Sequence, residues 1–170
     1  KAEAKRVAQP VNDICSAIPA DVAIGYHSCY GTLDGWPSRH PPDATGTVLL
    51  LNAVVEASGR QVEFVHFPTL AAADETFFRP FEDIDLRGAR AYVGAIHRLH
   101  GPNGLKAQIE CIRKFLPKFG LAAPCGFGRT PERPGELLSD QGGEARADYI
   151  EEILREHTKA VEILHDVMAS

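Results

Sequence analysis

Apolar residues recur along the chain at two spacings, one typical of amphipathic helices and one of short buried strands. Helical spacing predicts helices over Glu3–Ile18, Thr45–Ser58, short pieces of 70–83, Leu105–Leu116 and Ala145–Met168. Compact apolar runs between them predict strands over Asp21–Tyr26, Gln61–Phe67, Ala89–Ile96 and Leu121–Pro124. Because helices and strands alternate, the sequence predicts an α/β fold whose parallel strands are joined by right-handed crossovers.

Four parallel strands are half of a (β/α)8 barrel, and a complete TIM barrel needs about 250 residues. This chain has 170 residues, enough for a single domain over residues 1–170 with a sizeable core. We therefore expect either half of a barrel or a small open α/β sheet. A half barrel leaves the interior of its sheet exposed unless another segment covers it.

The composition is that of a globular protein, with 44% hydrophobic and 24% charged residues. The formal charge of −5 argues against nucleic acid or an anionic membrane as a partner. No apolar run approaches the roughly 20 residues that span a bilayer, and the first residues lack the apolar segment of a signal peptide. We expect a cytoplasmic protein, and from the missing initiator methionine we expect a fragment or a trimmed chain.

A histidine or cysteine lies at or just beyond the end of each of the four apolar runs. His27 and Cys29 follow the first, His66 ends the run Val62–His66, His97 follows the third and Cys125 the fourth. Folds of alternating strands and helices place their chemistry at such strand ends. Two thiolates with one or two imidazoles form a site that zinc prefers, and an open position makes such a site catalytic. We interpret His27, Cys29 and Cys125 as metal ligands.

The residue types also allow other uses. Cys29 could be a nucleophile activated by His27 or His97, and the turn Gly126–Arg129 could bind an anion through backbone N–H groups. His66 and His97 could instead be ordinary core histidines, in a metal-free binding module whose strand ends form a packed rim. Neither nucleophile nor anion site explains why four strand ends in a row carry histidine or cysteine.

A long loop follows the first strand, from His27 to Asp43, and loops of this length inside compact domains usually have a function. It is either a proline-stiffened surface excursion or a lid over a substrate. As a lid, it would offer Asp34, Trp36 as an apolar wall and Arg39 as an anion clamp. With Arg129 of the later turn, these residues are the candidate substrate contacts.

Three motifs resemble, in the same order, those of the C-terminal catalytic barrel of cobalamin-independent methionine synthase and its relatives in the uroporphyrinogen-decarboxylase-like group. They are His27-Ser-Cys29-Tyr30, Tyr92-Val-Gly-Ala-Ile-His97 and Cys125-Gly-Phe-Gly-Arg129. The resemblance implies a TIM barrel of which this chain supplies about the last four β/α units. The missing N-terminal half barrel, or another subunit, would then be its partner.

The resemblance also implies a zinc-dependent methyl or alkyl transferase that acts on a small molecule. His27, Cys29 and Cys125 would bind Zn²⁺, which a substrate thiol joins, His97 would transfer protons, and the methyl donor would be of the folate type. The residues that recognise an amino acid or a folate in that family lie largely in the earlier strands, which this chain does not contain.

The sequence departs from the family in two places. Methionine synthases carry a glutamate ligand where this chain has His66, so we expect His66 as the fourth ligand. A Cys₂His₂ set with Zn²⁺ is formally neutral, one unit less negative than a set with glutamate, and leaves a more electrophilic ion. This allows a zinc-assisted lyase, decarboxylase or hydrolase as an alternative. The loop Gly31–Asp43 has no counterpart in the methionine synthases and indicates a different substrate.

Overall fold

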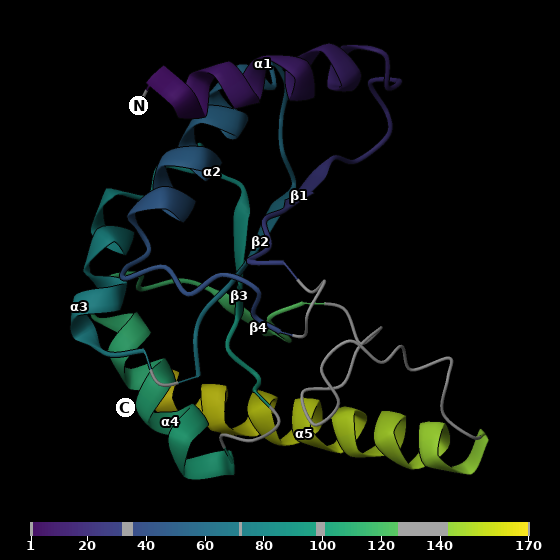
Figure 1. Cartoon of the computed structure of the whole chain (residues 1–170), viewed down its shortest axis with the longest axis vertical. Helices are drawn as coiled ribbons and strands as arrows, with labels where there is room; N and C mark the ends of the chain where they lie inside the picture. The colour runs from purple at the N-terminus through teal and green to yellow at the C-terminus, as the bar shows by residue number, and fades with distance from the viewer. Residues whose placement is uncertain (1, 32–35, 72, 98–100, 126–142, 170) are drawn as a thin grey trace.

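The computed structural model describes residues 2–31, 36–71, 73–97, 101–125 and 143–169. Figure 1 shows the order of its elements, which confirms the predicted alternation. The elements are α1 (Ala2–Ser16), β1 (Gly25–His27), α2 (Thr45–Ala57), β2 (Phe64–Pro68), α3 (Glu75–Phe78), the 3-10 helix η1 (Arg79–Asp83), β3 (Arg90–Gly94), α4 (Gly101–Arg113), β4 (Gly120–Ala122) and α5 (Gly143–Ala169).

The four strands form one parallel sheet in the order β1-β2-β3-β4. His27 lies opposite His66 in the register, His66 opposite Tyr92, and Tyr92 opposite Gly120. Each strand therefore pairs with the next one in the sequence, and all four carboxyl ends lie along one edge. This α/β sheet is compatible with part of a TIM-barrel-like fold.

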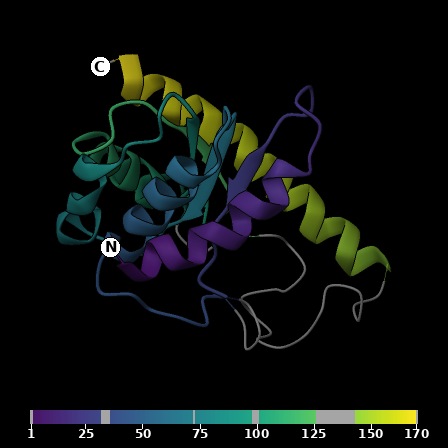
Figure 2. The ribbon, with the colours of Figure 1, turned by 90° about the horizontal axis from the view of Figure 1, so that it is seen from above.

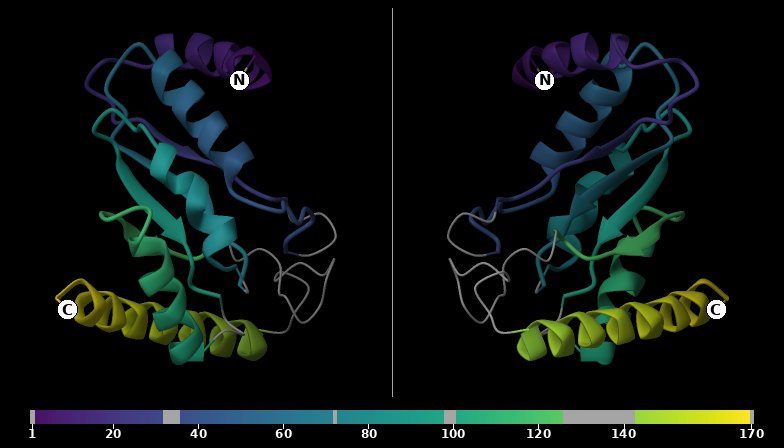
Figure 3. Two further views of the ribbon diagram at one scale, coloured as in Figure 1. Left: turned by 90° about the vertical axis from the view of Figure 1, so that its left-hand side faces the viewer. Right: turned by 90° about the vertical axis from the view of Figure 1, so that its right-hand side faces the viewer.

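One face of the sheet carries the core. The core residues of the two central strands are Val65, Phe67, Ala91 and Val93, and those of the helices that cover them include Leu51, Val55, Ile109 and Ile112. On the opposite face of β2, the Phe64 side chain is 39% exposed. Figure 3 shows this arrangement from two opposite sides. Helices thus cover one face, and within the described residues the other face is accessible at Phe64 but buried at Pro68 and Gly94.

The helix layer extends past both edges of the sheet. Helix α1 packs against α2, and α5 packs against α4 and the end of β4 (Figure 2). Among the α5 side chains that are described, Ile153, Ala160 and Val167 are buried, and charged residues lie between them. No helix in the described part of the chain is both long enough and apolar enough to cross a bilayer.

Arg60 fixes the connection between α1 and β1. Its guanidinium donates hydrogen bonds of 2.7 to 3.0 Å to four backbone carbonyls, those of Ile18, Pro19, Ala20 and Val22. The connection has no regular secondary structure of its own. One side chain therefore adds four hydrogen bonds to a segment in which the Val22 N–H donates to the Pro19 carbonyl.

We expect Arg60→Ala to lower the free energy of unfolding by about 2 kcal/mol, because four carbonyls lose a charged donor. Arg60→Lys should recover less than half of the loss, since an ammonium cannot match the planar fork of the guanidinium. Urea denaturation of the three proteins measures this. An Arg60→Ala protein as stable as the wild type would show that hydrogen bonds from water stabilise these carbonyls equally well.

Candidate metal centre

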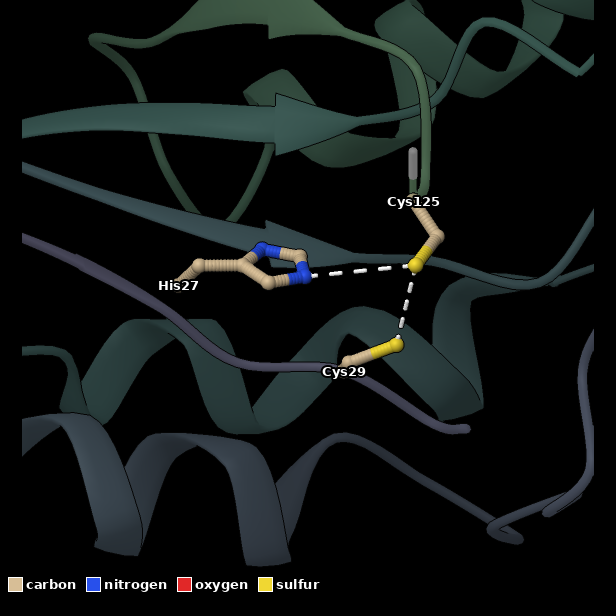
Figure 4. A group of neighbouring side chains, drawn as sticks. All are labelled: His27, Cys29 and Cys125. Atoms are coloured by element: carbon tan, nitrogen blue, oxygen red, sulfur yellow. Dashed lines mark hydrogen bonds between the residues drawn. The ribbon is translucent and has the colours of Figure 1, made fainter. Parts of the chain in front are cut away.

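Three potential metal ligands converge beyond the carboxyl ends of the two outermost strands. His27 is the last residue of β1, Cys29 follows it by two residues, and Cys125 lies three residues beyond β4. The sulfurs of Cys29 and Cys125 are 3.1 Å apart, and Nε2 of His27 is 4.0 Å from the sulfur of Cys125 (Figure 4). All three ligand atoms lie within 4.8 Å of one another. The group could therefore hold a metal ion.

Cys125 reaches this group because the chain after β4 crosses back over the sheet. A strand spacing of about 4.8 Å separates β1 from β4 by about 14 Å, with β2 and β3 between them. Pro124 lies so close to Gly94 of β3 that a Cβ on Gly94 would be 2.5 Å from the Pro124 Cα. The carbonyl oxygen of Ala123 lies 2.8 Å from Nε2 of His66 on β2. We call Ala123–Cys125 the crossing segment.

His66 lies beside the metal group. It is the middle residue of β2, which continues to Pro68, so the expectation that a strand ends at His66 is wrong. Its ring stacks on that of His27, with centroids 4.6 Å apart and planes at 26°. The group of converging ligand atoms comprises His27, Cys29 and Cys125 without His66. The role of His66 as a fourth ligand stays a prediction.

Partial desolvation favours the neutral form of both stacked imidazoles, although His27 remains exposed on one side. It lowers the pKa of His27 below the ordinary value of 6.5, and an interaction with the His66 carbonyl opposes this in part. It likewise lowers the pKa of His66, where the Ala123 carbonyl opposes the shift and the neighbouring His27 adds to it. A neutral imidazole is the form that binds metal ions.

These shifts make the stability of the metal-free protein depend on pH. Because the folded-state pKa values of His27 and His66 are lowered, the unfolded chain binds more protons near pH 6. The stabilisation is complete above the unfolded-state pKa of about 6.5. It is lost as the pH falls toward the lowered pKa values of the folded state. The urea concentration at the unfolding midpoint should fall as the pH is lowered from about 7.5 to 5. It should fall less steeply for His66→Gln than for the wild type. Equal slopes in the two proteins would contradict this.

His97 lies three residues beyond β3, where the buried hydroxyl of Thr69 holds its ring. That hydroxyl donates to the carbonyl of Gly94 at 3.0 Å, so its oxygen accepts from Nε2 of His97 at 3.3 Å. His97 also lines a cavity of about 90 Å³ next to Glu156 and Lys159. Thr69 escaped the sequence interpretation, although a hydroxyl directly after a strand is a signal that could have identified it.

The candidate substrate contacts are described in part. The Trp36 ring stacks on the Tyr30 ring at 5.9 Å and 8°, and the Arg39 backbone N–H donates to the Tyr30 carbonyl at 3.0 Å. This loop therefore folds back onto the residue that follows Cys29, with the Arg39 side chain exposed. Asp34 and Arg129 lie outside the described residues. Substrate contact by any of these side chains stays a prediction.

Two sulfurs and an imidazole nitrogen, the ligand types that zinc prefers, thus converge at one edge of the sheet. His27 and Cys29 are exposed there, so an ion would have room for a further ligand. No protein family, curated protein sequence or solved structure matches the chain.

Proposed function

We propose that His27, Cys29 and Cys125 bind zinc and that the protein is a zinc-dependent methyl or alkyl transferase, similar to cobalamin-independent methionine synthase. The observation that carries this proposal is the convergence of two thiols and one imidazole within 4.8 Å. They lie at the carboxyl edge of a parallel sheet, where folds of this class place their active sites.

Three protein ligands of this set carry two negative charges, so a Zn²⁺ site would be formally neutral and open at one position. When bound, the ion would supply the Lewis acidity that lowers the pKa of a thiol acceptor. The residues of the chain would hold and move the proton. Since Nε2 of His97 donates to the buried Thr69 hydroxyl, Thr69 would orient the His97 ring for that transfer.

The proposed function needs a cover for the accessible face of the sheet. One covered face and one that is partly accessible, at Phe64, is compatible with four β/α units of a TIM barrel before the barrel closes. The proposed partner is the N-terminal half barrel, in the same polypeptide or in another subunit. That half would carry most contacts to a small-molecule acceptor and a folate-type donor, and Trp36 and Arg39 would add contacts from this half.

Metal analysis tests the zinc site directly. Freshly purified protein with reduced thiols should contain about one zinc ion per chain. Adding a small thiol such as 2-mercaptoethanol to the cobalt-substituted protein should strengthen sulfur-to-metal absorption, because a thiol enters the open position. Protein that contains no zinc and takes up no cobalt would overturn the proposal.

The same three ligands also suit a zinc-assisted lyase, decarboxylase or hydrolase, since the exposed site admits water as readily as a thiol. Product analysis separates these reactions from alkyl transfer. A transferase forms product only when an acceptor thiol is present, whereas a lyase or hydrolase turns over its substrate without one.

A further inference from the structure

His66 contacts both chain segments that form the metal group. Its ring stacks on the ring of His27, and its backbone carbonyl accepts a hydrogen bond of 2.9 Å from the N–H of Ser28, between the first two ligands. Its Nε2 lies 2.8 Å from the carbonyl oxygen of Ala123, two residues before Cys125. One side chain on β2 thereby joins segments that are nearly a hundred residues apart in the sequence.

The hydrogen bond to Ala123 fixes the proton on the His66 ring. A carbonyl oxygen can only accept, so Nε2 of His66 must carry a proton and donate it. A ring nitrogen that carries a proton has no lone pair to offer a metal ion. In this arrangement Nε2 of His66 therefore cannot be a ligand, and in the described residues neither ring nitrogen of His66, Nδ1 included, belongs to the group of converging ligand atoms.

We propose that His66 is a positioning residue that orients the His27 ring and the crossing segment. This inference rests on the proposed function, and it replaces the fourth-ligand role predicted from the sequence. The position that His66 leaves free belongs to the substrate thiol or to water. A substrate then binds without displacing a protein ligand, and the three ligands keep their positions because His66 holds both segments that carry them.

Two variants of His66 separate positioning from ligation. In His66→Gln, the side-chain amide can still donate to the Ala123 carbonyl, whereas His66→Phe keeps a stacking ring and loses the donor. We expect His66→Gln to bind cobalt within about threefold of wild type, and His66→Phe to bind it roughly 10- to 100-fold more weakly. At saturation both variants should show the absorption spectrum of the wild type. His165→Gln, on the exposed side of α5, is the matched control.

A change of spectrum in both variants would show that a nitrogen ligand has been lost, and would overturn the inference while leaving the zinc site intact. Nitrogen-15 NMR of the full chain gives a second readout. The inference requires the Nε2–H tautomer of His66 both with and without metal, and the Nδ1–H tautomer in either state overturns it. A wild-type chain that binds no cobalt overturns the proposed function, and the inference with it.

Discussion

Replacing Cys125 with serine is expected to reduce the zinc content from about one ion per chain to almost none. A serine hydroxyl stays protonated at neutral pH and is a poor ligand for zinc, so the ion would keep only His27 and Cys29. Loss of one of three protein ligands should weaken binding by at least about 100-fold. Elemental analysis gives the content, and competition with a chromogenic chelator gives the affinity. Cys29→Ser should behave in the same way.

Cys111→Ser is the matched control for these two variants. Cys111 lies on α4, partly buried against the core and outside the metal group. This variant should keep its full zinc content even if it unfolds at slightly lower denaturant concentration. Full zinc content in both Cys29→Ser and Cys125→Ser would place the metal elsewhere and exclude the proposed centre.

Gly94→Ala is expected to destabilise the protein by about 2 kcal/mol and to weaken zinc binding as well, because added volume at a tightly packed site forces neighbouring atoms to move. The new Cβ would lie 2.5 Å from the Pro124 Cα and 2.9 Å from the Ala123 oxygen. These are backbone atoms, which cannot rotate away as a side chain can. The crossing segment must shift, and Cys125 shifts with it. Urea denaturation and chelator competition measure the two effects.

Two other glycines supply controls for Gly94→Ala. A Cβ on Gly120 would meet the Tyr92 ring at 2.7 Å, a partly exposed side chain that can turn aside, so Gly120→Ala should cost less. A Cβ on Gly46, at the start of α2, has nothing within 4 Å. Gly46→Ala should stabilise the protein by about 0.5 kcal/mol through helix propensity. If Gly94→Ala changed the stability of the protein as little as Gly46→Ala does, the close packing of the crossing segment would be refuted.

The order of helices and strands could be predicted because local periodicity records which side of each element is buried. The parallel sheet followed from their alternation, and the pair of His27 and Cys29 from its spacing. The crossing segment could not be predicted in this way. Nothing in the local sequence of Cys125 says that it turns back over β3, since this depends on the missing side chain of Gly94, about thirty residues earlier.

The environment of His66 could not be predicted from the sequence for the same reason. The run up to His66 looks like a strand that ends in a ligand, yet β2 extends to Pro68 and the ring turns to Ala123. Which ring nitrogen carries the proton depends on a carbonyl 57 residues away. Contacts at that separation are set by tertiary packing, which the periodicity of one segment does not record.

The crossing segment also has a consequence for how the chain folds. Each strand pairs with its successor, so the sheet can assemble stepwise, although every pairing in a parallel sheet must first close a loop. The contacts of Cys125 with His27 and Cys29 join residues 98 and 96 positions apart, so we expect them to form late. An ion held there acts as a cross-link, and chain-entropy arguments give a cross-link over about 100 residues a stabilisation of about 4 to 5 kcal/mol. Metal would then slow unfolding more than it speeds folding.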